Sequence, residues 1–527
     1  MSLDGNLPIA INSDTPDTGN IHYRIQTDRD RQLIAEGFVW ADVLRFRRYY
    51  EGKHKILLTD RQREILRNLD LMDFCDNVCG QIVSESKGRL TFNKWTCKNQ
   101  EVKDFLDTLF AMQSVGEFQN DTHLRSLRDG NFVVMINWDD EAGFPEFFHE
   151  DWWDGIKGVY IHYNASQKAE YAVKQWAYLN TQNVTVWRRL VWFPDRIERY
   201  ESTAPGSFTS WVQSSLPEDI VDGQVVFPMP WLDEKGKSLG IPYIHFRNSY
   251  KTYGKYGVSE LDGGVIGFQD QLNDSMISMQ ITSRMTGAQQ YWGTGIKLKT
   301  RDNSREPLPI KVDAGMFHTS ENVDSKFGVL PAGNMDQQIA GYLLKLKRVA
   351  QITATPLHAI TGGDWPSGDA ILRAELPAVN KAKTQIESFK ASWCAVGRMA
   401  LKIWNAYCDP SERINYNPKK GIIEADFDDP ENFDMVSRSI VAHNLAGQVS
   451  KKEILRIMDY TEEQTDDIYE EYVQEQKDET NAMASAIVRG AGTGTASGNP
   501  ATKINKPKPG KGGALGGGNN KPSVNPQ

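Results

Sequence analysis

The chain has 527 residues and a mass of 59.5 kDa, roughly three to four times a typical ~150-residue domain, so the sequence predicts more than one core. Hydrophobic residues make up 39% and charged residues 24%, a balance that is ordinary for folded proteins and excludes general disorder. The 69 Asp and Glu outnumber the 60 Lys and Arg. The formal charge of −9 therefore has the opposite sign from that of a protein that binds nucleic acid over its whole surface.

Cysteine content and hydropathy indicate the environment of the protein. Five cysteines, an odd number, argue against a disulfide framework and for a reducing compartment. No apolar run approaches the ~18 residues of a membrane span. Residues 1–20 are polar and acidic and lack the basic and apolar regions of a secretory signal. We therefore expect a cytoplasmic protein of several parts, with a flexible arm over residues 1–20.

The first half of the chain mixes helical and strand patterns, which predicts an α+β fold. Residues 21–89 carry apolar side chains at helical spacing, with Gly52 placed to end a helix. From about residue 131 to 226 the pattern changes to short β-rich runs at 132–138, 159–163, 184–187 and 190–193. Many aromatic residues lie in this zone, as expected for an antiparallel sheet whose faces are covered.

The middle of the chain predicts two long helices joined by a β-containing stretch. An apolar stripe at intervals of three and four runs through Val258, Leu261, Val265, Phe268, Leu272, Met276 and Met279. A second stripe, ending before Pro356, consists of Ile339, Leu343, Leu346 and Ala350. Residues 289–331 between them contain Gly, Pro and Lys. A turn-rich loop follows at 361–368.

The loop leads into one long predicted helix over residues 369–407. Pro377 near its start removes a backbone hydrogen bond and clashes with the preceding turn, so we expect a kink there. Beyond it, residues from Ile386 to Tyr407 form an apolar seam at intervals of three and four, which predicts a partner helix. Capping boxes at Ser450 and Thr461 then open short helices in an acidic region. The Gly- and Pro-rich residues from about 490 onward are predicted to be disordered.

Motifs of catalysis are missing from the sequence. It contains no phosphate-binding loop, no His-Glu-x-x-His and no Gly-x-Ser-x-Gly. His149 and its two acidic neighbours resemble metal ligands in type, but alternation along a strand would direct adjacent side chains to opposite faces. Asp195 stands in an acidic and basic turn that we interpret as a surface ion pair. Cys75 and Cys79 lack a second pair at zinc-site spacing. We predict no catalytic residue, metal or cofactor.

A basic cluster lies in the stretch between the two stripe-bearing helices. Its members are Lys297, Lys299, Arg301, Arg305 and Lys311. Lysines and arginines in such a group bind phosphates in a salt-dependent way. A solvated hairpin rim or a protein-docking surface explains them equally well, so both interpretations stay open.

Five short blocks follow one another along the chain at residues 49–54, 239–248, 257–273, 366–373 and 449–453. They include Tyr-Tyr-Glu-Gly-Lys-His, Leu-Gly-Ile-Pro-Tyr-Ile-His-Phe-Arg-Asn, Gly-Val-Ser-Glu-Leu followed by Gln-Asp-Gln-Leu-Asn, Pro-Ser-Gly-Asp-Ala-Ile-Leu-Arg, and Val-Ser-Lys-Lys-Glu. In sequence and in order these blocks resemble those of the portal proteins, or head-to-tail connectors, of tailed bacteriophages.

The resemblance implies a portal-type fold with a defined order of parts. Residues 21–257 would form an α/β wing, 258–287 and 336–353 two stem helices, and 288–335 a small β-containing clip between them. Residues 354–368 would form the tunnel loop, 369–408 a kinked tunnel helix, 409–480 a helical crown and 481–527 a disordered tail.

Particular residues take roles under this resemblance. The tunnel loop would be formed by Thr361, Gly362, Gly363, Asp364, Trp365 and Ser367, and clip docking to the packaging motor or neck proteins by Lys297, Lys299, Arg301, Arg305 and Lys311. Stem packing would involve Leu261, Phe268, Leu272, Met276, Leu343 and Leu346, and Pro377 would kink the tunnel helix.

The implied function is a non-enzymatic ring of twelve subunits at one capsid vertex of the virion, assembled in the host cytoplasm. Double-stranded DNA would pass through it, and its partners would be the terminase large subunit, scaffold and major capsid proteins, and a neck or adaptor protein, with no membrane and no cofactor. Twelve chains of charge −9 carry about −108, which repels DNA from the channel wall. Two alternatives remain: a structural shell or scaffold protein without a channel, and a metal-dependent phage nuclease using His149 and Asp195.

Overall fold

The computed structural model divides the chain into two compact units, Met1–Glu431 and Asn432–Gln527. It describes residues 21–35, 40–56, 58–68, 76–205, 210–213, 220–221, 224–225, 227–248, 254–287, 291–295, 322–329, 335–361, 368–417, 421–430, 449–458, 460, 465–466, 468–474 and 477. The described chain is a mixed α+β structure, about half helical, with several antiparallel sheets and no closed barrel among these residues. None of the helices in these ranges is long and apolar enough to cross a membrane.

Both units contain helices among the described residues. They are α1 (Ile21–Ala35), α2 (Trp40–Tyr50), α3 (Asp60–Asn68), α4 (Val78–Gly88), α5 (Gln100–Met112), α6 (Val115–Asp129), α7 (Val265–Gly287), α8 (Met335–Thr353), α9 (Leu357–Thr361), α10 (Gly368–Tyr407) and α12 (Lys451–Ile457). All but α12 belong to the first unit.

The strands form antiparallel sheets. They are β1 (Phe92–Thr96), β2 (Asn131–Asp139), β3 (Phe144–Glu150), β4 (Gly158–Tyr163), β5 (Ala169–Leu179), β6 (Thr185–Trp192), β7 (Arg196–Ser202), β8 (Val212–Gln213), β9 (Ile220–Val221), β10 (Gln224–Val225), β11 (Met229–Pro230), β12 (Tyr243–Arg247), β13 (Tyr291–Thr294), β14 (Lys326–Val329) and β15 (Glu424–Phe427). A six-stranded sheet has the order β11-β7-β6-β5-β4 with β8 beside β7, and a three-stranded sheet has the order β12-β2-β3. The pairs β1–β15, β9–β10 and β13–β14 stand apart from these two sheets.

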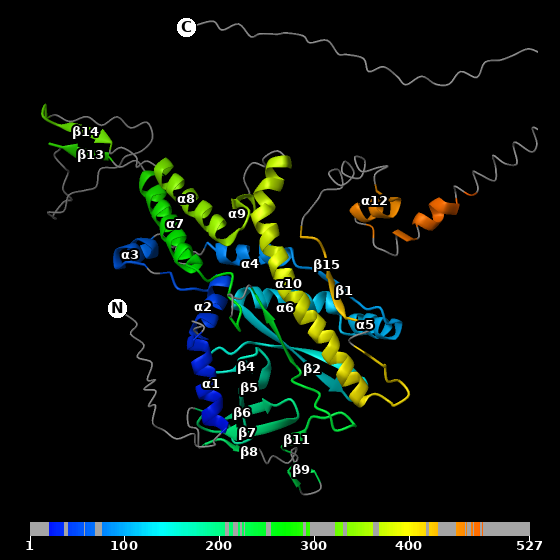
Figure 1. Ribbon diagram of the computed structural model, residues 1–527. Helices are drawn as coiled ribbons and strands as arrows, with labels where there is room; N and C mark the ends of the chain where they lie inside the picture. The colour runs from blue at the N-terminus through cyan, green and yellow to red at the C-terminus, as the bar shows by residue number, and fades with distance from the viewer. Residues whose placement is uncertain are drawn as a thin grey trace, which may run out of the picture. The chain divides into compact units, whose positions relative to one another are not determined.

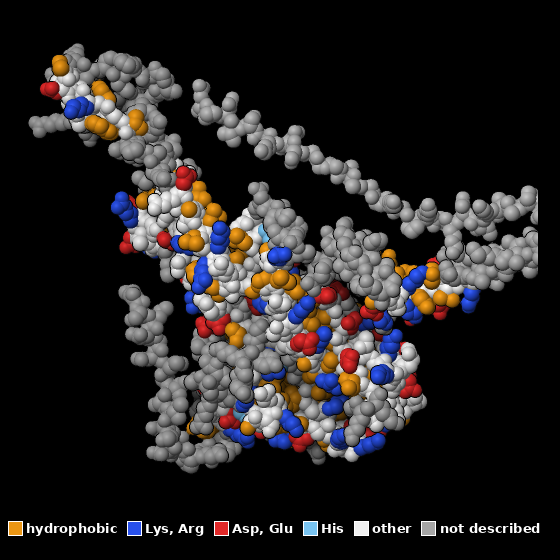
Figure 2. All heavy atoms as spheres, turned by 45° about the horizontal axis from the view of Figure 1, so that its top comes forward, with side chains coloured by type: hydrophobic (Ala, Val, Ile, Leu, Met, Phe, Trp, Pro, Cys, Tyr) orange, Lys and Arg blue, Asp and Glu red, His pale blue; other side chains and the backbone are white. Residues whose placement is uncertain are grey.

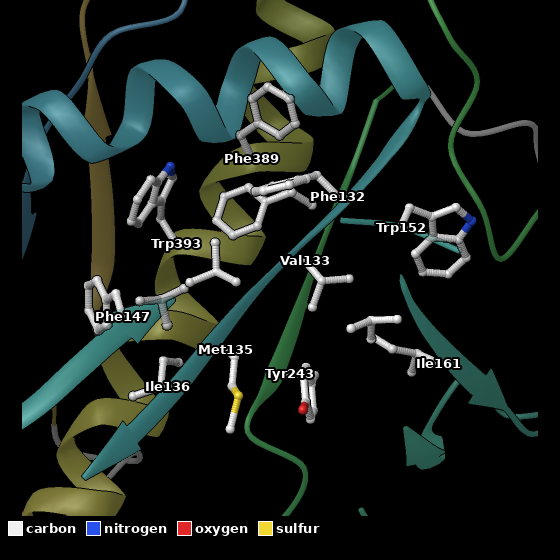
Figure 3. Packing of buried hydrophobic residues seen from close by; sticks show 14 of the residues in the cluster. Phe132, Val133, Met135, Ile136, Phe147, Trp152, Ile161, Tyr243, Phe389 and Trp393 are labelled. Atoms are coloured by element: carbon white, nitrogen blue, oxygen red, sulfur yellow. The ribbon is translucent and has the colours of Figure 1, made fainter. Parts of the chain in front are cut away.

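The core of the first unit is built on β2, whose first six residues are all buried. Alternate side chains of a strand point to opposite faces, so a strand buried on both faces has a nearly continuous apolar sequence. In Figure 3, Phe132 is on the face of β2 that is covered by Phe389 of α10. Val133 is on the opposite face, toward Ile161 of β4. Helices α6 and α10 pack against the three-stranded sheet (Figure 1). The sheet is therefore the central layer between helices and the six-stranded sheet.

Several predicted elements are confirmed, and two predicted strands are joined into one. The run predicted as a strand at 132–138 is β2, and the run at 159–163 lies in β4. The two short runs predicted at 184–187 and 190–193 form one strand, β6. The helix predicted from residue 369 is α10, which contains Pro377 and changes direction along its length in Figure 1. The predicted capping box at Ser450 opens α12, because its side-chain oxygen accepts a hydrogen bond from the Glu453 amide at 3.3 Å.

The first long helix of the middle zone begins later than its apolar stripe. The sequence predicts a helix from residue 258, but α7 begins at Val265. Gly263 and Gly264 have φ angles of +69° and +93°, a left-handed conformation that a right-handed helix excludes. Leu261 consequently lies in the preceding turn, where it is buried. Residues 421–430, which the portal resemblance assigns to the crown, contain β15, which pairs with β1 in the first unit.

Close backbone contact fixes the connection between β2 and α7. Gly130, with φ +81°, ends α6, and a Cβ atom there would lie 2.8 Å from the Ser259 amide nitrogen. Asn131 accepts a hydrogen bond from the Gly257 amide at 2.7 Å, and the Asn248 amide donates to the Gly130 carbonyl at 3.0 Å. The chain that leads into α7 is therefore held against the start of β2.

A polar chain runs through the aromatic core around α10. The indole N–H of Trp393 donates to His123 Nε2 at 3.0 Å, so the imidazole proton is on Nδ1 and is donated to the Leu90 carbonyl at 3.0 Å. Trp95 Nε1 in turn donates to the Trp393 carbonyl at 2.8 Å, and Phe92 stacks on Trp393 with ring centroids 4.7 Å apart. Burial lowers the pKa of His123 to about 4, so the ring is neutral at pH 7.

Trp393→Phe is expected to destabilise the protein by about 1–3 kcal/mol from the lost donor alone, because His123 Nε2 would remain buried without a partner. Urea unfolding measures the change. Trp404→Phe is the matched control, because the indole of Trp404 donates to the Glu412 carbonyl at an exposed site, so we expect a loss of less than about 1 kcal/mol. Equal losses in the two variants would contradict the assigned network.

Helix α1 is held on the six-stranded sheet by a buried cation that has no carboxylate partner among the described residues. Arg189 on β6 donates to Gln175 Oε1 at 2.8 Å and contacts His22 Nδ1 at 3.1 Å, and its guanidinium lies 3.9 Å from the centroid of the Trp211 ring. Burial, and then the charge of Arg189, lower the pKa of His22 to about 4. Burial also lowers the pKa of Arg189 to about 9. Docking of α1 therefore requires a neutral His22.

This contact makes stability depend on pH. Because the folded-state pKa of His22 lies below its ordinary value, the unfolded chain binds more protons between about pH 6.5 and 4, and stability falls as the pH falls through that window. At pH 5 the loss from His22 alone is about 2 kcal/mol. Urea unfolding at pH 8 and pH 5 is the measurement. His22→Gln keeps a hydrogen-bond acceptor for Arg189 but does not titrate. Its free energy of unfolding should therefore fall by about 2 kcal/mol less than that of the original protein between pH 8 and pH 5. An equal fall in the two proteins would refute the prediction.

Candidate stem surface and loop anchor

Helices α7 and α8 form an antiparallel pair in the part of the chain predicted to be a stem (Figure 1). Leu272 and Leu346 are buried, whereas Phe268 and Met276 are half-buried. Polar contacts join the helices along their length. Gln338 donates to Thr282 Oγ1 at 3.2 Å, and Lys345 Nζ donates to Ser275 Oγ at 2.5 Å. The strands β13 and β14 pair with each other and lie in the chain between the two helices.

The first turns of α7 are attached to α2 and α4 through buried polar side chains. Tyr49 donates its phenolic O–H to Asp270 Oδ1 at 2.7 Å, and burial followed by this hydrogen bond raises the pKa of Tyr49 to about 12. Asn273 contacts His54 Nε2 at 2.8 Å, and the Cys79 amide donates to Gln269 Oε1 at 3.1 Å. These bonds fix the direction in which the helix pair leaves the body of the unit.

Large apolar side chains on α8 and on the β13–β14 hairpin are exposed. Ile339, Leu343 and Leu344 are 44%, 43% and 68% exposed. Trp292 and Phe327, on β13 and β14, are similarly uncovered. Hydrophobic side chains are visible on this part of the surface at the upper left of Figure 2. The helix and the paired strands therefore each present large apolar side chains to solvent.

The predicted tunnel loop is bounded by two helices that contact each other. Helix α9 ends at Thr361 and α10 begins at Gly368. His358 Nε2 of α9 lies 3.5 Å from Glu375 Oε1 of α10, and Arg89 lies 3.8 Å from the same carboxylate. The two ends of the loop are therefore held together by contacts across its base.

A buried ion pair joins α10 to the end of α8 and to the segment before α7. Lys381 Nζ donates to Glu260 Oε2 and to the Thr353 carbonyl, each at 2.7 Å. The Glu260 side chain is only 7% exposed, and Gln385 Nε2 donates to its other oxygen at 2.7 Å and to Asn248 Oδ1 at 2.9 Å. Lys381 and Glu260 thus connect α10 to the end of α8 and to the segment that leads into α7.

The predicted site residues fall into three groups. Leu272 and Leu346 are buried in the first unit, and Leu343 is largely exposed. Thr361 is exposed at the end of α9. The remaining predicted residues of the loop and clip lie outside the described residues, namely Gly362, Gly363, Asp364, Trp365, Ser367, Lys297, Lys299, Arg301, Arg305 and Lys311.

His149 and Asp195, the residues of the nuclease alternative, contact different neighbours. His149 contacts Thr122 Oγ1 at 3.0 Å and stacks on Phe118 with centroids 3.7 Å apart, and burial lowers its pKa. Asp195 is exposed and pairs with Arg196 at 3.3 Å. Among the described residues, no group of three or more His, Cys, Asp or Glu is arranged to hold a metal ion.

Sequence analysis missed the ion pair of Lys381 and Glu260. Glu260 lies in a block that carries the portal resemblance, but nothing in its neighbours indicates burial. Lys381 is one of two lysines in the first half of α10, the other being Lys383. The periodicity of α10 is the one available signal, because Lys381 stands one position before the buried Ala382, at the edge of the apolar seam.

No protein-family model matches the chain, and no curated protein sequence matches it either.

Lys381→Met is expected to destabilise the first unit by about 3–5 kcal/mol, because Glu260 would be left as a buried charge without its cation. The double variant Lys381→Met/Glu260→Gln should recover part of this loss. Lys390→Met on the same helix is the control. Lys390 forms an exposed pair with Glu387, so its removal should cost at most about 1 kcal/mol. Urea unfolding gives all three values, and a double variant less stable than Lys381→Met would contradict the pairing.

Proposed function

We propose that the protein is the portal protein of a tailed bacteriophage, a ring of twelve subunits through which double-stranded DNA is packaged and ejected. The observation that carries the proposal is the exposed apolar side of α8, formed by Ile339, Leu343 and Leu344. In a closed ring each copy presents such a side to its neighbour, and burial there removes it from water. The resemblance of the five sequence blocks supports the same conclusion.

The arrangement of elements suits a channel that guides DNA without binding it tightly. A two-helix stem with a β hairpin inserted between its helices, followed by a loop and a long helix containing Pro377, is the order expected of a portal-type fold. The exposed aromatic residues Trp292 and Phe327 give the hairpin a surface for protein docking. The net negative charge of the chain disfavours a tight hold on phosphates.

This role has defined partners and needs no catalysis. The clip would dock the terminase large subunit during packaging and a neck or adaptor protein afterwards. Scaffold and major capsid proteins would hold the ring at one vertex of the virion. The loop at 362–367, anchored by the contact between His358 and Glu375, would face the DNA.

The proposal is tested by light scattering after size exclusion, with negative-stain images of the same peak. A ring of twelve copies of a 59.5-kDa chain has a mass of about 714 kDa and a central bore. Leu343→Glu and Leu344→Glu place a charge on the exposed apolar side and should shift the protein to smaller species while circular dichroism stays unchanged. Gln337→Glu, an exposed change on the same helix, is the control and should leave the ring intact.

Two results would count against the portal. Particles without a bore would favour the structural shell or scaffold alternative. A 59.5-kDa monomer at all protein concentrations, with scaffold protein present as well as absent, would remove the ring itself.

A further inference from the structure

A cavity of about 560 Å³ lies beside the C-terminal half of α10. Its walls come from α10 between Arg398 and Ala406, the turn at residues 233–239 and the segment 413–416. Side chains of Leu239, Leu401, Ile414 and Tyr416 form part of the lining. The volume falls in the range of about 300–1,000 Å³ that is usual for sites that bind small molecules.

Hydrogen bonds within the fold hold the cavity walls in place. Asn405 accepts from the Ile414 amide at 2.9 Å and donates to the Ile414 carbonyl at 3.0 Å, which fixes the segment 413–416 against α10. Asp233 Oδ1 accepts from the amides of Lys235 and Lys237 at 3.0 and 2.7 Å and so shapes the opposite turn. Side-chain hydrogen bonds therefore fix the shape of two of the three segments that line the cavity.

Positive charge predominates in the lining. Lys235, Lys237, Arg398, Lys402 and Arg413 all contribute to it, against Asp233 and Glu234. Glu234 pairs with Arg413, and Asp233 already accepts two backbone amides. Within the part of the chain that the structure describes, no ion pair is formed by the other four cations.

The cations also lie close enough to repel one another. Burial, followed by the charges of Lys237 and Arg398, lowers the pKa of Lys402. The ammonium of Lys402 is 4.0 Å from the position that a Cβ atom on Gly240 would take, so it lies at the wall between α10 and the turn. An anion in the cavity would relieve this repulsion and favour the charged form of Lys402.

We propose that this cavity binds a small organic phosphate of about the size of a nucleotide. A phosphate monoester carries a charge of about −1.5 to −2 at pH 7 and three acceptor oxygens, which matches several convergent cations better than a single carboxylate does. The guanidinium of Arg398 supplies the planar donors that phosphate accepts. The apolar side chains in the lining would contact the organic part, and the cavity is too small for a DNA duplex.

The inference goes beyond the channel, because it concerns a site on one subunit that is complete without a neighbouring copy. Its test is independent of ring formation. Isothermal titration calorimetry of the full chain uses four probes: adenosine 5′-monophosphate, adenosine, inorganic phosphate, and a peptide of residues 468–479, which is rich in glutamate. The nucleotide should bind at least about tenfold more tightly than adenosine or inorganic phosphate, a difference of about 1.4 kcal/mol.

Variants identify the cavity as the place of binding. Lys402→Gln and Lys237→Gln should each weaken binding of the nucleotide at least about tenfold. Thermal melting checks that both substitutions leave the fold intact. Lys103→Gln, which removes an exposed lysine on α5, is the control and should not change binding.

Three outcomes would overturn the inference. The first is no nucleotide binding, or binding that both cavity variants leave unchanged. The second is inorganic phosphate binding as tightly as the nucleotide, which would mean that the organic part makes no contact. The third is binding of the acidic peptide alone, dependent on Lys402, which would make the cavity a docking site for a protein segment.

Discussion

The first unit depends on burying β2 on both of its faces. A strand in this position needs a cover on each side, and α10 with α6 provides one while the six-stranded sheet provides the other. Trp393 of α10 is central to this packing. Its ring stacks in the aromatic core, and its indole N–H donates a hydrogen bond to the buried His123. A polar group inside such a core is tolerated only when it has a partner, so the pairing of Trp393 with His123 selects one position of α10 along the sheet.

The N-terminal half of α10 contacts α8, α9 and the segment before α7. Further toward its N-terminus, Lys381 reaches Glu260 and the end of α8, and Glu375 reaches α9. Helix α10 thus has a core contact in its C-terminal half and charged contacts in its N-terminal half. These contacts keep α8, α9 and α10 together, because a buried ion pair holds its partners within hydrogen-bonding distance.

Two kinds of surface remain on this framework, and they differ in chemistry. The exposed side of α8 is apolar, so contact with another chain would remove it from water, as the proposed ring requires. The cavity beside the C-terminal half of α10 is lined by cations and suits a small anion. The overall negative charge of the chain therefore coexists with a local concentration of positive charge in one cavity.

The sequence by itself determined the local elements: the apolar run of β2, the length of α10 with Pro377 inside it, and the cap at Ser450, because each follows from the period or the chemistry of adjacent residues. It also determined the order of the blocks that resemble a portal. Only the tertiary structure decided that Glu260 meets Lys381 and that the cations of one cavity come from three segments of the chain. Contacts between residues more than a hundred positions apart leave no trace in local periodicity, because they depend on how the chain folds back on itself.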